Sequence, residues 1–216
     1  GVPQFRNLPP KALQVCYAMA ENVFAVTQTD PAKQPKVISV TAASLLEGQR
    51  AIPASDDRST VRLLSCGRPI DGVGLRIAGK SDQDGAIGEI LISGQSLYSG
   101  YYHRPEITAQ RLRDGWHHTG DIGFLHQDEL YILGRVDDLL NVRGKNIYAH
   151  EVEDVVNGLK LAIPGRVVTF SIPNEALGTS DMVVLCETAD GTLDAAAKRT
   201  IREVVNSTFG VTITRL

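Results

Sequence analysis

The most distinctive residues of this chain are Asp114-Gly-Trp-His-His-Thr-Gly-Asp-Ile-Gly123, followed by Gly134-Arg-Val-Asp-Asp-Leu-Leu-Asn-Val-Arg-Gly-Lys145. Taken alone, Thr119-Gly-Asp121 can be an ordinary turn, since glycine and aspartate are favoured in turns for local reasons. Gly134-Arg-Val-Asp-Asp138 can likewise be a charged linker, in which an exposed ion pair contributes little to stability. The remaining sequence must therefore decide between a structural and a ligand-binding interpretation.

The composition is that of a soluble globular chain with one large or two small domains, because 43% of its 216 residues are hydrophobic and 22% are charged. The net charge of −3 is spread along the chain, so neither nucleic acid nor an acidic membrane is expected as a partner. Cys16, Cys66 and Cys186 are odd in number and far apart, which favours reduced thiols over disulfides or a metal cluster. We find no export signal and no run near the ~20 apolar residues of a membrane span, and we expect a cytoplasmic protein.

The first part of the chain has the pattern of short strands. A buried strand is expected to end near Tyr17, with residues 18–21 as its exit loop. Residues 27–62 are polar and rich in proline, and we interpret them as an insertion that contains one short helix at residues 41–48. Alternating strands bounded by glycine follow, which predicts a bent antiparallel sheet or small barrel. These strands are residues 74–77, 88–93 and 130–133.

After Gly134 the spacing of apolar residues changes to that of a small α+β domain. It predicts helices at residues 150–157 and 193–207, with a hairpin of residues 167–172 and 181–187 between them. Residues 211–216 look like a strand that is cut short. We therefore expect an α+β chain with two domains, residues 1–136 and residues 137–216, the second of them incomplete.

Four other side chains invite a functional interpretation, and each also has an ordinary one. Tyr17 can be a packed aromatic residue, and Glu21 can be a solvated surface carboxylate. His117 and His118 suggest a general base, but neighbouring residues on an extended strand point to opposite faces and cannot serve one site together. We interpret the two histidines as structural.

The order of six motifs changes this balance in favour of function. They are Tyr17-Ala-Met-Ala-Glu21, Ser65-Cys-Gly-Arg-Pro69, Gly88-Glu-Ile90, Ser99-Gly-Tyr-Tyr102, Gly115-Trp-His-His-Thr-Gly-Asp121 and Gly134-Arg-Val-Asp-Asp138. In this order they resemble the adenylate-forming superfamily of acyl- and aryl-CoA synthetases, luciferases and peptide-synthetase adenylation domains. The long insertion, Ala20 within the Tyr-x-x-x-Glu motif and the Ser65–Pro69 motif look most similar to the fatty acyl-AMP ligase branch.

This resemblance implies an enzyme that uses ATP to activate a fatty acid as acyl-AMP. The acyl group would pass to the phosphopantetheine arm of an acyl carrier protein or carrier domain instead of to coenzyme A, and the insertion would restrain a small mobile C-terminal domain. The fold implied is the C-terminal part of a large adenylate-forming domain, with a bent antiparallel sheet, followed by a truncated small α+β domain.

The resemblance also implies roles for individual residues. Tyr17 would offer its ring to adenine, and Glu21 would offer an oxygen to Mg²⁺. Asp121 would accept hydrogen bonds from two ribose hydroxyls, with Arg135 donating to the same sugar. Asp137 matches the family's hinge position. Gly144 and Lys145 match the loop that enters the site for acyl transfer.

Two elements that the family uses for catalysis have no counterpart in this sequence. These are a loop rich in Ser, Thr and Gly that ends in Lys and wraps the ATP phosphates, and the adenylation lysine after a late glycine. Losing even one such electrostatic donor typically reduces the rate about a hundredfold. We therefore expect a piece of a longer enzyme that carries no catalytic residue, is inactive alone and tends to associate through exposed edges.

Two alternatives stay open at this point. The run from Arg135 to Gly144, with Asn141 where many relatives have Lys, also looks like that of acetyl-CoA synthetases, which would make the parent enzyme an acyl-CoA synthetase. The scaffold can also have become a non-catalytic module that binds a lipid or a protein.

Overall fold

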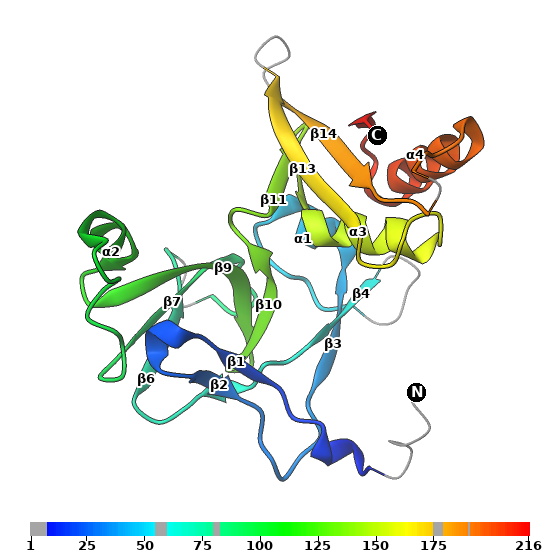
Figure 1. Cartoon of the computed structure of the whole chain (residues 1–216). Coiled ribbons are helices and arrows are strands. Elements are labelled where there is room, and N and C mark those ends of the chain that lie inside the picture. The colour runs from blue at the N-terminus through cyan, green and yellow to red at the C-terminus, as the bar shows by residue number, and fades with distance from the viewer. Residues whose placement is uncertain (1–7, 55–59, 80–82, 175–178, 190) are drawn as a thin grey trace. The chain divides into compact units, whose positions relative to one another are not determined.

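The structure is a computed structural model that describes residues 8–54, 60–79, 83–174, 179–189 and 191–216 (Figure 1). Its contacts divide the chain into two compact units, one up to Leu133 and one from Gly134 onward. Each unit is described by itself. The assignment of residues 1–136 and 137–216 to a large and a small domain stays a prediction.

A curled antiparallel sheet forms the centre of the first unit (Figure 1). Its strand order is β10-β9-β7-β6, with the short β8 paired to β9. In β7, Ile90 and Ile92 share one face and are fully buried, and Leu91 on the other face is 4% exposed. The strands are β6 Val73–Ile77, β7 Gly88–Gly94, β8 Leu112–Arg113, β9 Trp116–His126 and β10 Glu129–Arg135. The bent antiparallel sheet expected from the sequence is thereby confirmed.

A second sheet of three short strands brings the N-terminal segment onto this core. The strands β1 Cys16–Ala18, β2 Ala25–Gln28 and β5 Arg68–Pro69 pair in the order β1-β2-β5. Tyr17 from β1 and Val26 from β2 share one buried cluster with Ile77, Ile90, Ile92 and Leu130 of the central sheet. The first predicted motif is therefore packed directly against the strands that carry the later ones.

The segment interpreted as an insertion contains a hairpin and a short helix. Strands β3 Val37–Thr41 and β4 Thr60–Leu64 pair antiparallel, and α1 Ala42–Glu47 follows β3 directly. The hydroxyl of Thr41 caps α1 by accepting from the Ser44 amide at 3.4 Å, and Gly48 ends the helix in the left-handed conformation. The helix matches the one expected at residues 41–48, whereas the hairpin was not predicted.

Short helical elements complete the first unit. The 3-10 helices are η2 Pro10–Ala12 and η3 Ala20–Asn22. The α-helix α2 Pro105–Arg111 has no buried residue and extends from the central sheet before β8 (Figure 1). Because none of its side chains is buried, α2 lacks the apolar periodicity that reveals a helix in a sequence.

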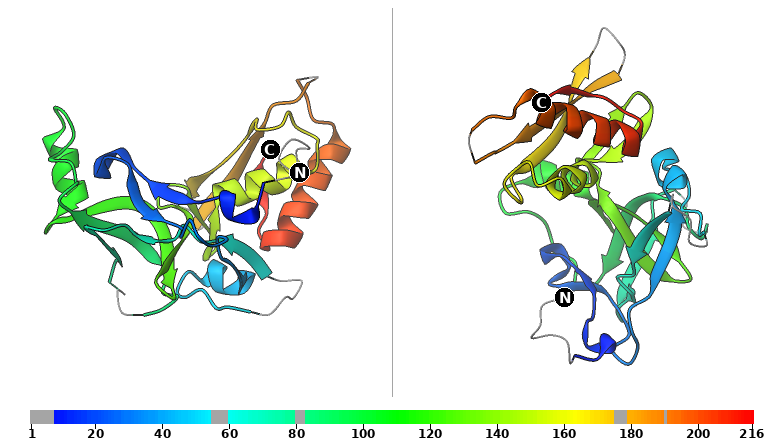
Figure 2. Two further views of the ribbon diagram at one scale, coloured as in Figure 1. Left: turned by 90° about the horizontal axis from the view of Figure 1, so that it is seen from below. Right: turned by 90° about the vertical axis from the view of Figure 1, so that its right-hand side faces the viewer.

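The second unit places two helices on one face of a three-stranded sheet (Figure 2). Strands β13 and β14 are antiparallel, and β15 joins β14 in parallel after the crossover through α4. The buried side chains of this face and of the helices form the core. They are Val152 and Val156 of α3, Val167, Met182 and Val184 of the sheet, and Ile201, Val205 and Phe209 of α4.

The elements of the second unit follow the expected order, preceded by a hairpin. They are β11 Leu139–Val142, β12 Lys145–Tyr148, α3 Ala149–Gly158, β13 Val167–Asn174, β14 Thr179–Cys186, α4 Ala195–Phe209 and β15 Ile213–Arg215. The opposite face of β13 and β14 exposes Val168, Phe170, Ile172 and Leu185. Exposed apolar side chains of this kind can promote association, which stays a prediction.

Candidate functional site

The structure brings Tyr17 and Asp121 together although they lie 104 residues apart in sequence. The Tyr17 hydroxyl donates a short hydrogen bond of 2.5 Å to Asp121 Oδ2. Tyr17 is only 8% exposed, and Asp121 is half-buried on β9. An aromatic ring and an acidic side chain from two different sheets thus meet at one point of the first unit.

A β-bulge between β7 and β9 directs Asp121 toward this point. Glu89 pairs with Ile122 and Leu91 pairs with His118, so that Ile90 alone faces the three residues 119–121. Bulges of this kind change the direction in which a side chain points. The Thr119 hydroxyl stabilises the bulge by donating to the Ile90 carbonyl at 2.8 Å and accepting from the Asp121 amide at 3.0 Å.

The bulge also needs a glycine at its centre. Gly120 adopts φ +76°, a left-handed conformation that side chains other than glycine enter at an energetic cost. The sequence Thr119-Gly-Asp121 is therefore a local structural device, as its composition suggested. It is also the device that holds Asp121 in place.

Glu21 is fixed on the 3-10 helix that follows β1. Its Oε1 accepts from the Tyr101 hydroxyl at 2.7 Å, and its carbonyl oxygen accepts from the Tyr98 amide at 2.8 Å. The chain reverses immediately afterwards, because the Phe24 amide donates to the Asn22 carbonyl at 2.7 Å while Val23 takes φ +66°. Glu21 therefore occupies a constrained position in the same unit as Tyr17 and Asp121.

A buried histidine supports the tyrosines behind Glu21. The ring of Tyr98 meets the rings of Tyr101 and His117 edge to face, with centroids 4.9 Å and 5.2 Å apart. Burial lowers the pKa of His117 below its usual range, an effect that nearby Arg111 and His118 strengthen and that Glu21 and Glu89 oppose. Burial raises the pKa of Tyr98 and, together with the hydrogen bond to Glu21, that of Tyr101. These side chains are neutral at pH 7.

His117 and His118 point in opposite directions along β9. His117 is 2% exposed, whereas His118 is half-buried, with its Nδ1 2.9 Å from Glu89 Oε2. This arrangement is the one that an extended strand imposes on neighbouring residues.

The lowered pKa of His117 predicts that the first unit loses stability in mild acid. The folded state disfavours protonation, so the stabilisation is complete above the ordinary pKa of about 6.5 and falls as the pH drops below it. His117→Gln, which cannot titrate, should flatten this decline between pH 7 and pH 5.5 in urea unfolding followed by Trp116 fluorescence. Equal slopes for His117→Gln and the unmodified chain would contradict the assignment to His117.

Arg135 and Asp137 follow the boundary between the two units at Gly134, and Arg135 is the last residue of β10. Both are exposed, and the turn between them is closed by the Asp138 amide, which donates to the Arg135 carbonyl at 3.2 Å. The ribose-binding role of Arg135 and the hinge role of Asp137 stay predictions.

Gly144 and Lys145 form the tip and the first strand residue of the β11–β12 hairpin. Arg143 and Gly144 have φ +52° and +78°, as in the two-residue turns that suit the twist of a hairpin. The Lys145 ammonium donates to the carbonyls of Phe209 at 3.0 Å and Gly210 at 3.3 Å, at the C-terminal end of α4. A cation is favourable at this end of a helix. Lys145 thus stabilises the fold here, and its part in acyl transfer stays a prediction.

No group of three or more His, Cys, Asp or Glu side chains that could hold a metal ion occurs among the described residues. Glu21 as a single carboxylate nevertheless fits Mg²⁺, which commonly takes one or two protein carboxylates and completes its shell with water and substrate phosphates. In the described part of the chain, no helix has both the length and the apolar character needed to cross a membrane.

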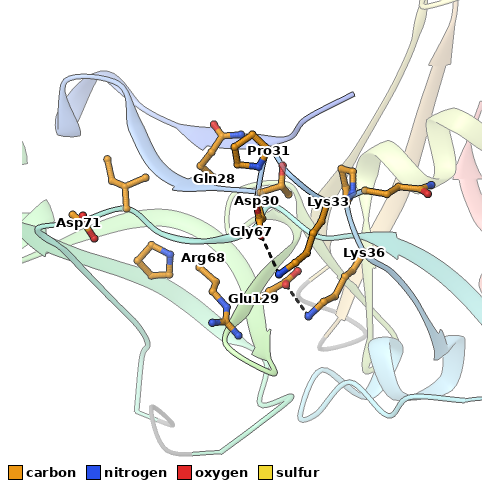
Figure 3. Close-up of a pocket in the computed structure, with 14 residues that line it drawn as sticks. Gln28, Asp30, Pro31, Lys33, Lys36, Gly67, Arg68, Asp71 and Glu129 are labelled. Carbon is orange, nitrogen blue, oxygen red and sulfur yellow. Dashed lines mark ion pairs between the residues drawn. The ribbon is translucent and has the colours of Figure 1, made fainter. Parts of the chain in front are cut away.

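A hollow of about 580 Å³ lies apart from these residues, beside the loop between β2 and β3 (Figure 3). Its charges are largely paired: Lys33 lies 3.0 Å from Asp30, and Lys36 lies 2.8 Å from Glu129. Burial favours the neutral form of Glu129, but hydrogen bonds from Lys36 and Ser65 outweigh it and lower the pKa of Glu129. Ser65 of the second motif therefore has a structural role.

Comparisons with known proteins show which family the chain belongs to. No family model matches the chain. It is 32% identical over 212 residues to a candidate fatty-acid–CoA ligase, fadD21 of Mycobacterium leprae, and the match covers 88% of the chain and 34% of that protein. It is 31% identical over 194 residues to the long-chain-fatty-acid–AMP ligase FadD32 of Mycolicibacterium smegmatis, covering 79% of the chain and 31% of the relative.

A solved structure from the fatty acyl-adenylate ligases of E. coli and L. pneumophila superposes with a TM-score of 0.82 at 29% identity. That match covers 97% of the chain and 38% of the solved protein. The chain belongs to the adenylate-forming superfamily, as the order of its motifs implied. Within it, the chain is similar to fatty-acid ligases, and it spans about a third of the length of the curated relatives it matches.

Proposed function

We propose that this chain is the nucleotide-binding portion of a fatty acyl-AMP ligase, which activates a fatty acid with ATP as acyl-AMP and passes it to the phosphopantetheine of a carrier protein. The contact between Tyr17 and Asp121 carries the proposal, because it joins the first motif to the fifth through a hydrogen bond of 2.5 Å. If the Tyr17 and Asp121 motifs were only local turns, nothing would require this contact between them.

The chemistry of these side chains suits a nucleotide. The Tyr17 ring would lie against adenine, and Asp121 would accept from the ribose hydroxyls, since an ionised carboxylate has about four acceptor positions. Glu21, held by Tyr101, would contribute one ligand to Mg²⁺. When bound, Mg²⁺ supplies positive charge that neutralises the phosphates of ATP. The resemblance also assigns Arg135 a hydrogen bond to the ribose, and this role stays a prediction.

Titration of the labelled chain with AMP, followed by NMR, tests this assignment even when binding is weak. The amides of Tyr17, Gly120 and Asp121 should shift together, and 2′,3′-dideoxy-AMP should bind at least about a hundredfold more weakly, because it lacks both hydroxyls. Equal affinity for the two nucleotides, or shifts confined to other surfaces, would contradict the proposed ribose site.

The acyl acceptor is the finer part of the proposal. The insertion at residues 27–62 supports a carrier protein, whereas Asn141 and the similarity to a candidate fatty-acid–CoA ligase support coenzyme A. A longer protein that contains this segment should form a thioester with a phosphopantetheinylated carrier protein and little or none with free coenzyme A. The reverse preference would make it an acyl-CoA synthetase. Nucleotide binding without any adenylate would indicate a non-catalytic module.

A further inference from the structure

The bulge that directs Asp121 leaves the Gly120 amide to a side-chain acceptor. Gly120 is buried, and its N–H cannot join the ladder between β7 and β9 because the strands are out of register there. This amide donates instead to Glu89 Oε1 at 3.0 Å. A side chain from the neighbouring strand therefore provides the hydrogen bond that the backbone cannot.

The carboxylate of Glu89 is itself held in position. Its second oxygen, Oε2, lies 2.9 Å from His118 Nδ1, and the two side chains are 23% and 19% exposed. Glu89 thus bridges residues 118 and 120 of β9, and Thr119 between them is bonded to the Ile90 carbonyl. Three consecutive residues before Asp121 are tied to β7.

We propose that Glu89 is a positioning residue for Asp121: it fixes the Gly120 amide and so keeps the Asp121 carboxylate at Tyr17. Without Glu89 the buried Gly120 amide would lack a partner, a loss that favours a different bulge conformation. The residue after Gly120 is Asp121, so any rotation of the intervening peptide displaces the carboxylate. The proposal rests on the nucleotide role of Asp121, and it assigns a purpose to the Gly88-Glu-Ile90 motif.

Three substitutions separate positioning from a general loss of stability. Glu89→Ala removes the acceptor, whereas Glu89→Gln keeps an oxygen that can accept from Gly120. Glu129→Ala is the matched control: Glu129 lies on the same sheet and accepts from Ser65 at 2.6 Å, far from the bulge in the register of the strands. It should lower stability without changing the affinity for AMP.

Amide hydrogen exchange and AMP titration by NMR are the two measurements. In Glu89→Ala, exchange at Gly120 should accelerate about tenfold and AMP should bind about tenfold more weakly, as expected for one lost hydrogen bond. In Glu89→Gln, the slow exchange at Gly120 and the affinity for AMP should both be largely retained. Unchanged exchange at Gly120, or faster exchange with unchanged AMP affinity, would overturn the proposal.

A different result would contradict the proposed function and not the role of Glu89. If the unmodified chain binds no AMP, the nucleotide site is wrong, and the position of Asp121 is then read from its carboxyl ¹³C resonance. That resonance should move in Glu89→Ala and stay in place in Glu89→Gln and Glu129→Ala. A resonance that is the same in all four proteins would show that Glu89 does not position Asp121.

Discussion

Asp121→Ala should weaken AMP binding by this chain by about a hundredfold or more, because two hydrogen bonds from ribose hydroxyls to a charged acceptor contribute about 1.5–3 kcal/mol each. The same NMR titration measures the effect. The affinity of Asp121→Asn for AMP should lie between those of the unmodified chain and Asp121→Ala, since the amide retains one acceptor oxygen but not the charge.

The same substitution also removes the hydrogen bond that the Tyr17 hydroxyl donates to Asp121. Tyr17 is 8% exposed, and losing a hydrogen bond to a charged acceptor costs about 1.5–3 kcal/mol of stability. Tyr17→Phe separates the two effects, because it removes the hydroxyl and keeps the ring that would contact adenine. We expect Tyr17→Phe to bind AMP far better than Asp121→Ala does. A folded Asp121→Ala protein with unchanged affinity would exclude Asp121 from the site.

The regular strands could be predicted because their sequences alternate between apolar and polar residues and are bounded by glycine. Residues 88–93 correspond to β7 in this way. The long strand β9 Trp116–His126 was not predicted, because Gly120 and Gly123 interrupt the alternation. Gly120, which interrupts the alternation, lies at the centre of the bulge that directs Asp121.

The helices of the second unit were predictable for a related reason. In α4 the buried residues Ile201, Val205 and Phe209 recur at helical spacing, so that the pattern itself reports the packing. The hairpin of β11 and β12 carries no such signal. Its turn depends on Arg143 in a left-handed conformation, which residues other than glycine rarely adopt.

The residues of the candidate site could be predicted from their motifs, but the contacts between them could not. Tyr17, Glu21 and Asp121 could be named because they stand in motifs whose order identifies the superfamily. Glu89 and Tyr101 stand in motifs as well, but their partners are the Gly120 amide and the Glu21 carboxylate. Those contacts depend on strand register and loop packing, which local sequence does not specify.

Gly67→Ala should destabilise the first unit severely, by at least about 3 kcal/mol, which is a large fraction of the roughly 5–15 kcal/mol that holds a domain folded. A Cβ on Gly67 would lie 2.1 Å from the backbone carbon and oxygen of Gln28 on β2, where no flexible side chain can give way. The Gly67 carbonyl also accepts from the Leu130 amide at 2.8 Å. Gly67 is thus held between β2 and β10 and cannot move aside.

Gly72 provides the matched control, because it has φ +82° against +83° for Gly67 and a Cβ there would meet nothing within 4 Å. Gly72→Ala therefore carries only the conformational penalty, about 1–2 kcal/mol. The free energies of unfolding in urea, followed by the fluorescence of Trp116, should differ between the two variants by the steric term alone. Gly67 lies beside β2, which pairs with the strand β1 that carries Tyr17. Equal losses of stability in the two variants would mean that β2 can shift. The fixed position of Tyr17 against Asp121 would then need another explanation.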